Sequence, residues 1–248
     1  MSRIYESLKS AAKPSSALTG TKSTTNQSTV TPTLQCAERF DMLEEMITLY
    51  QNIDHLLPDT LKRAIQFIGS RSGEGTSVIA REFANVARNN FGKSVLIIDG
   101  NTRSLDQCAF FGVSPSMTLW DVLNNAQLPV CDALYNVKTP DIFICAIAQE
   151  HTTVHGNFNA KTMKDLLDVL KKQFDLIVID SAPALSSTDG VGFSSSVDGV
   201  VLILEAETTR WPVAEETKNR ILRNGGNILG IVLNKRQYYT PEFIYKRL

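Results

Sequence analysis

Apolar residues follow two different spacings along this chain. Six short runs are almost continuously apolar and rich in Val and Ile, without the alternation of a strand that has one exposed face. Such runs are typical of strands that are covered on both faces, and hence of a parallel sheet. We expect strands at 64–69, 94–99, 141–146, 175–180, 198–204 and 228–233.

Between these runs the apolar residues recur every three or four positions, which is the spacing of an amphipathic helix. The predicted helices are 37–53, 77–90, 117–125, 159–173 and 212–224. An alternation of strands and helices predicts an α/β fold with a doubly wound, mostly parallel sheet. In such a sheet ligands bind at the carboxyl ends of the strands.

The first part of the chain has a different character. Residues 1–13 carry an amphipathic pattern that predicts a short N-terminal helix. Residues 14–35 are rich in Ser and Thr, and a segment of this composition buries too little apolar area to offset its ordering entropy. We therefore expect 14–35 to be a disordered linker and 36–248 to be one folded domain.

Composition excludes some classes of function. A formal net charge of −1 over 248 residues gives no general electrostatic reason to expect a nucleic-acid partner. The four cysteines have no metal-binding spacing, and no apolar run reaches the roughly 18 residues that a membrane span needs. We expect a cytoplasmic protein whose link to a membrane comes through a partner. Trp120 and Trp211 are expected to be packing residues.

A glycine-rich loop stands between the first predicted strand and the next predicted helix. The stretch from Gly69 to Val78 reads Gly-Ser-Arg-Ser-Gly-Glu-Gly-Thr-Ser-Val. In this position the backbone N–H groups of a loop and the positive end of a helix dipole bind phosphate. The expected nucleotide-binding residues are Gly73, Glu74, Gly75, Thr76, Ser77 and Val78. The P-loop pattern requires a lysine where Thr76 stands.

Two other interpretations of this loop stay open. It can be a purely structural turn between a strand and a helix. It can also be a dinucleotide-binding fingerprint, with Asp99 placed to bind a ribose, although the third glycine of that motif is missing. The fingerprint leaves the second carboxylate, Asp180, unexplained.

Two predicted strands end in an aspartate, Asp99 and Asp180. Both carboxylates are expected at the same sheet edge as the glycine loop, because the carboxyl ends of parallel strands meet there. Two carboxylates and a loop hydroxyl are what a hydrated Mg²⁺ beside nucleotide phosphates requires, and Ser77 is placed to supply the hydroxyl. The alternative is that each aspartate caps the turn that follows it.

These motifs together resemble the bacterial tyrosine kinase (BY-kinase) family, which belongs to the deviant-Walker P-loop NTPases with the MinD and ParA ATPases. The similarity covers most of 36–248, and the matching segments are 70–77, 95–103, 176–183 and 230–235. The resemblance implies a P-loop fold of the SIMIBI class that binds ATP or ADP with Mg²⁺. It also implies that Asn234 contacts the base, that Asp99 takes part in catalysis, and that a membrane polysaccharide co-polymerase or export protein is the partner.

The chain departs from the family pattern in several places. Thr76 carries no charge for the phosphates, and its presence is expected to slow phosphoryl transfer by about 10²- to 10³-fold. Arg71 is a candidate for the missing charge. Asn101 replaces the second acid of its motif, and the family's helix arginines for ring assembly are absent, which places a family-type homo-oligomer in doubt. The tail tyrosines implied as autophosphorylation sites are Tyr238, Tyr239 and Tyr245.

Three functions follow. The first is a regulatory nucleotide-binding protein of exopolysaccharide synthesis or export with weak or lost catalysis. The second is an active tyrosine autokinase in which Arg71 or another subunit supplies the missing charge. The third is an ATPase switch of the MinD or ParA type.

Overall fold

The structure is a computed structural model, and it describes residues 42–59, 61–125, 127–138, 141–149 and 160–237. The predicted N-terminal helix, the linker, the tail tyrosines and the start of the predicted helix 37–53 lie outside these residues. Within the described part, no helix is long and apolar enough to cross a membrane.

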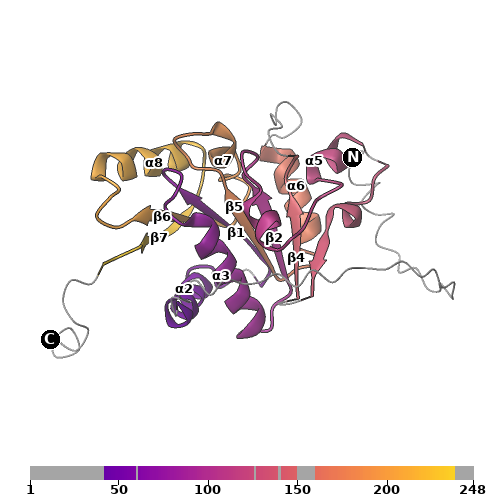
Figure 1. The fold of residues 1–248 in the computed structure, drawn as a ribbon, viewed down its shortest axis with the longest axis horizontal. Coiled ribbons are helices and arrows are strands. Elements are labelled where there is room, and N and C mark those ends of the chain that lie inside the picture. Colours follow the sequence, from indigo (N-terminus) through magenta and orange to yellow (C-terminus); the bar gives the residue numbers. More distant parts are fainter. Residues whose placement is uncertain (1–41, 60, 126, 139–140, 150–159, 238–248) are drawn as a thin grey trace.

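The centre of the fold is a seven-stranded sheet with the order β3-β4-β2-β5-β1-β6-β7 (Figure 1). Neighbouring strands are parallel, except that β3 pairs antiparallel with β4. The strands are β1 (Arg63–Gly69), β2 (Val95–Gly100), β3 (Tyr135–Val137), β4 (Ile142–Ala146), β5 (Leu176–Ser181), β6 (Gly199–Glu205) and β7 (Ile228–Asn234).

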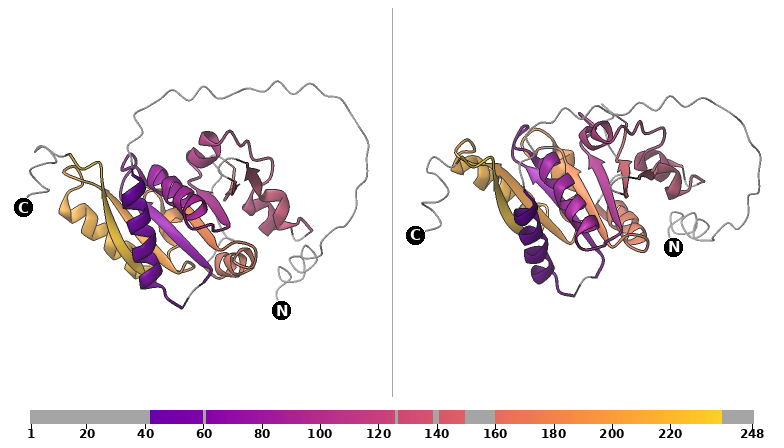
Figure 2. Two further views of the ribbon diagram at one scale, coloured as in Figure 1. Left: turned by 90° about the horizontal axis from the view of Figure 1, so that it is seen from below. Right: turned by 60° about the horizontal axis from the view of Figure 1, so that its bottom comes forward.

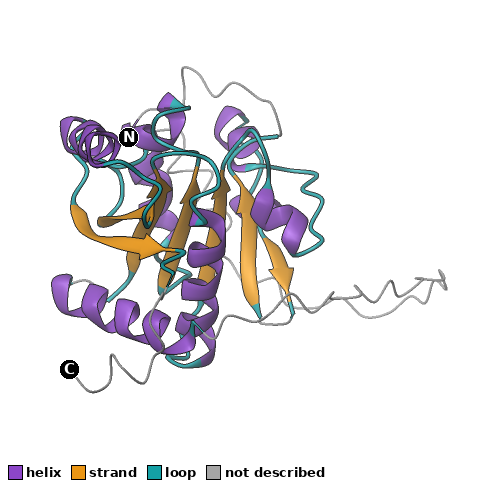
Figure 3. Ribbon diagram, turned by 60° about the vertical axis from the view of Figure 1, so that its left-hand side comes forward, coloured by secondary structure: helices purple, strands orange, loops and turns teal. Residues whose placement is uncertain are grey.

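Helices cover both faces of this sheet, as Figures 2 and 3 show. On one face α2 (Leu43–Leu56), α3 (Thr76–Asn89) and α4 (Asp106–Phe110) contribute to one hydrophobic cluster with the strands. The opposite face packs in two further clusters. Its helices are α5 (Leu119–Asn124), the 3₁₀ helix η1 (Val130–Ala133), α6 (Ala160–Leu170), α7 (Thr188–Gly192) and α8 (Trp211–Arg223).

The apolar runs form the strands that their composition predicts. All of the residues of β2 and β5 are buried, because helices lie on both sides of these central strands. All six predicted strands are present, each within one or two residues of the predicted ends. The strand β3 and the short helices α4 and α7 were not predicted. Trp211 is 75% exposed, so the expectation that it is a packing residue is wrong, whereas Trp120 packs against the core.

Candidate functional site

The glycine-rich loop joins the end of β1 to the start of α3. Gly73 and Gly75 have φ angles of 91° and 89°, in the left-handed region that glycine adopts without strain. Gly75 is the N-cap of α3 and provides no side-chain cap. Among the described residues, none accepts a hydrogen bond from the backbone N–H groups of 73–77. The start of α3 therefore presents uncapped donors, which suits an anion.

Glu74 fixes the first part of this loop from inside. Its carboxylate is buried, and Oε2 accepts hydrogen bonds from the backbone N–H groups of Ser70 and Arg71 at 2.5 and 3.0 Å. The other oxygen, Oε1, accepts from the Thr209 hydroxyl at 2.6 Å. Because both oxygens are engaged within the protein, Glu74 shapes the loop instead of facing a ligand with a free carboxylate.

The end of β7 holds the second part of the loop. The Asn234 amide donates to the carbonyl of Glu74 at 2.9 Å, and the Lys235 ammonium donates to the carbonyl of Gly73 at 2.6 Å. A side chain on Gly75 would come within 2.1 Å of the Asn234 amide nitrogen, so this contact also requires a glycine there. Asn234, predicted to contact a base, thus lies directly against the loop, and its contact with a base remains a prediction.

The two predicted carboxylates meet at the sheet edge. Asp99 at the end of β2 and Asp180 at the end of β5 are register partners on neighbouring parallel strands. Both side chains are essentially buried, at 0% and 1% exposure. Asp99 Oδ2 accepts from the backbone N–H groups of Gln107 and Cys108, at 2.8 and 3.1 Å, so it caps α4. The remaining oxygen of each carboxylate, Oδ1, has no hydrogen-bond partner.

Burial makes this pair costly to ionise. The pKa of Asp99 is raised to about 7 by burial, reinforced by the neighbouring charge of Asp180. Burial also raises the pKa of Asp180 to about 6, against the hydrogen bonds from Gln107 and Ser77. Two buried carboxylates with free oxygens are satisfied by a cation, and Mg²⁺ is bound by oxygen donors of this kind. The donor set therefore fits a divalent cation, which when bound would neutralise phosphate charge.

Ser77 lies where a loop hydroxyl for that cation is expected. It is the second residue of α3, its Oγ donates to Asp106 Oδ2 at 3.5 Å, and it is one of the groups that act to lower the pKa of Asp180. The structure thus brings Ser77, Asp99 and Asp180 together at one edge. Arg71 and Val78 are exposed. Asn101 bonds within its own turn, to Ser104 and to the backbone N–H of Arg103.

Sequence reasoning did not find Gln107 and Arg81, which complete the site. The buried Gln107 amide donates to Asp180 Oδ2 at 2.8 Å and to the carbonyl of Ser77 at 2.7 Å. Arg81 donates to Gln107 Oε1 at 3.4 Å and stacks over the Phe110 ring. Burial lowers the pKa of Arg81. One sequence signal was available, since Arg81 follows Ser77 by one helical turn.

The chain is similar to bacterial tyrosine kinases. It is 26% identical over 220 residues to the tyrosine-protein kinase CpsD of Streptococcus pneumoniae, and the matched residues cover 86% of this chain and 94% of that protein. It is 24% identical over 195 residues to the tyrosine-protein kinase ptk of Acinetobacter johnsonii, covering 79% of this chain but only 26% of that protein. The chain thus spans about a quarter of the second relative. No protein-family model matches the chain.

Solved structures give the same result for the fold. The kinase domain of Escherichia coli tyrosine kinase ETK superposes with a TM-score of 0.72 at 19% identity, covering 80% of this chain and 78% of that one. The chimerical protein CapA2B2 superposes with a TM-score of 0.70 at 25% identity, covering 79% of this chain and 85% of that one. The septum site-determining protein MinD of Pyrococcus horikoshii, complexed with Mg-ADP, superposes with a TM-score of 0.56 at 22% identity, covering 75% of this chain and 76% of that one. The predicted resemblance and the P-loop fold are confirmed.

Proposed function

We propose that this chain is a nucleotide-binding protein of the bacterial tyrosine kinase type that acts in exopolysaccharide or capsule biosynthesis, with weak or lost catalysis. It binds ATP or ADP at the loop 70–77, with Mg²⁺ at Ser77, Asp99 and Asp180. The observation that carries this proposal is the pair of unpartnered oxygens on Asp99 and Asp180, next to a loop in which the backbone N–H groups of 73–77 have no acceptor among the described residues.

The weakness of its chemistry is inferred from Thr76. Phosphoryl transfer depends on charges placed around the phosphates, and a threonine hydroxyl supplies none. The second acid of the neighbouring motif is also uncharged, because Asn101 stands there and its amide is engaged within its own turn. Nucleotide binding would then control assembly with a partner, and not a reaction.

The proposed partner is a membrane polysaccharide co-polymerase or export protein, through which a cytoplasmic chain would be held at the membrane. The family resemblance supports this proposal. Large apolar side chains exposed near the α8 and β7 end of the molecule also fit a docking role. They are Trp211, Leu222, Ile231 and Leu233, at 75, 50, 51 and 63% exposure.

One observation favours a second candidate, the active tyrosine autokinase. Lys235 brings an ammonium group to the loop, at 2.6 Å from the carbonyl of Gly73, and Tyr238 follows only three residues later in the sequence. Arg71 is a further cation in the loop. A MinD- or ParA-type switch is less favoured, since the TM-score of the MinD structure is 0.56 against 0.72 for a tyrosine kinase domain.

Incubation of the purified protein with ATP and Mg²⁺, followed by mass analysis of the tail, distinguishes the two candidates. The proposed function predicts that phosphate on Tyr238, Tyr239 and Tyr245 accumulates at least ~10²-fold more slowly than in Thr76→Lys. Rapid phosphorylation of the natural protein would instead identify an active autokinase.

A further inference from the structure

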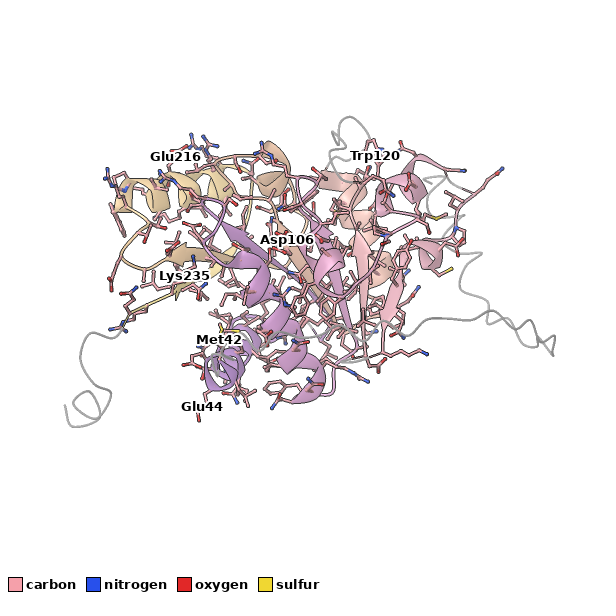
Figure 4. All side chains as sticks on the ribbon, viewed as in Figure 1. Met42, Glu44, Asp106, Trp120, Glu216 and Lys235 are labelled. Carbon is pink, nitrogen blue, oxygen red and sulfur yellow. The ribbon has the colours of Figure 1, made fainter. Side chains whose placement is uncertain are left out.

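Asp106 is an acidic residue that the motifs do not include. It is the first residue of α4, is exposed, and has its Oδ2 atom 3.5 Å from the hydroxyl of Ser77. In Figure 4 it is labelled near the centre of the molecule, away from Glu216 and Lys235 on the α8 and β7 side. The carboxylate therefore lies beside the hydroxyl that is assigned to the metal.

The position of Asp106 is fixed by its neighbours in α4. The next two residues, Gln107 and Cys108, donate their backbone N–H groups to Asp99. The Gln107 side chain bonds to both Asp180 and the carbonyl of Ser77. Because α4 is attached to all parts of the metal site, Asp106 is held at that site and is not a freely moving surface acid.

The charge of Asp106 is unfavourable without a cation. Its Oδ2 is 3.5 Å from the Ser77 hydroxyl, and the Gln107 side chain joins Ser77 to the buried Asp180, so like charges gather at this edge and repel one another. Arg81 offsets part of this charge, but it donates to Gln107 and stacks on Phe110 instead of pairing with Asp106. A third acid next to two buried ones costs stability unless a cation is present.

Asp106 also borders a hollow with room for solvent. The hollow has a volume of about 430 Å³ and is lined in part by Asp106, Ala109, Ser114 and Gln149, whereas Ser77, Asp99 and Asp180 do not line it. Bound Mg²⁺ usually keeps several of its waters, and an exposed carboxylate such as that of Asp106 can accept a hydrogen bond from one of them. The described residues contain no group of three His, Cys, Asp or Glu close enough to coordinate one ion. Asp106 would therefore act through water.

We propose that Asp106 supplies the carboxylate that is missing at Asn101, and that it holds the nucleotide's divalent cation through a bound water. This inference rests on the proposed function, since it places one more residue in the same nucleotide site. It makes Asp106 a positioning residue for the metal. The side chains that contact the metal directly remain Ser77, Asp99 and Asp180.

The test is the Mg²⁺ dependence of ADP binding to the full chain, measured by calorimetry. Loss of an outer-shell partner lowers metal affinity by about 10- to 100-fold, so Asp106→Asn should raise the half-maximal Mg²⁺ concentration at least about tenfold. ADP binding without Mg²⁺ should not weaken. Adding Asn101→Asp to Asp106→Asn should recover most of the loss, because an aspartate at 101 still accepts from the backbone N–H of Arg103 and can accept from the Ser104 hydroxyl, to which the Asn101 amide now donates.

Asp168→Asn is the matched control, since it makes the same change at an exposed position on α6. It should leave the Mg²⁺ midpoint unchanged. An unchanged midpoint in Asp106→Asn would overturn the inference alone, as would an equal loss of ADP affinity with and without Mg²⁺. Absence of ADP binding by the natural protein under both conditions would overturn the proposed function and this inference together.

Discussion

Asp99 and Asp180 lie directly opposite one another on the neighbouring strands β2 and β5, and each retains one buried oxygen without a partner. Two like charges on residues that lie opposite one another are costly when both are buried. Folding nevertheless brings the two carboxylates together. Each stands near the end of a strand that is covered on both faces, and the core fixes the register of these strands. The pair is the part of the molecule from which ligand binding follows most directly.

The pH dependence of stability should reveal this pair. The pKa values of Asp99 and Asp180 are raised in the folded protein to about 7 and 6, from 3.8. Between pH 4 and 7 the folded state therefore binds more protons than the unfolded state, and the pair's contribution to stability falls as pH rises. We expect the free energy of unfolding, measured with urea and without added metal, to fall less between pH 4 and pH 7 in Asp180→Asn than in the natural protein. Identical pH profiles would contradict the assignment.

Glu74 should be essential to the shape of the loop. Glu74→Ala removes the acceptor for two backbone N–H groups and the partner of Thr209. We expect a loss of about 1–3 kcal/mol in the free energy of unfolding, the usual result of leaving buried donors unsatisfied. Chemical denaturation measures it, with the exposed Glu45→Ala on α2 as the control. A loss no larger than that of the control would show that the loop holds its shape without this carboxylate.

Gln107 should connect the stability of the site to the ionisation of Asp180. Gln107→Leu removes the donor at 2.8 Å from Asp180 Oδ2, so the pKa of Asp180 should rise further and stability at pH 8 should fall by about 1–3 kcal/mol. The loss should be smaller at pH 5, where Asp180 is protonated. Denaturation at the two pH values checks this. A loss of equal size at both would mean that Gln107 acts by packing alone.

Lys235 should act on the loop and not on the terminal phosphate. Lys235→Met removes the donor to the carbonyl of Gly73 and an ion pair with Glu205 at 3.2 Å. We expect ATP and ADP affinities to fall by a similar factor, about fivefold, because about 1 kcal/mol of loop stabilisation is lost. Lys218→Met, exposed on α8, serves as the control. A selective loss of ATP affinity would instead favour the autokinase candidate.

The main elements could be predicted because the signals for them are local. Continuous Val and Ile runs gave the six long strands, and the rule that parallel strands end at one edge brought Asp99 and Asp180 together. The three-residue strand β3 and the five-residue helix α4 are too short to show a periodicity. The roles of Gln107 and Arg81 depend on how α4 docks against β2 and β4, which places the Gln107 side chain at Asp180 on β5 and which no spacing in the sequence reveals. Trp211 was wrongly expected to be buried, since its exposure depends on where α8 begins.

The most direct test of the central claim is equilibrium binding of ADP and ATP to the natural protein, with and without Mg²⁺, beside Asp180→Asn. If the loop and the carboxylate pair form a nucleotide site, the natural protein binds either nucleotide more tightly with Mg²⁺, and Asp180→Asn loses most of that gain. Absence of binding by the natural protein under both conditions would contradict the account. If the natural protein does not bind nucleotide but Thr76→Lys does, the chain has kept the nucleotide-binding fold and lost the binding itself.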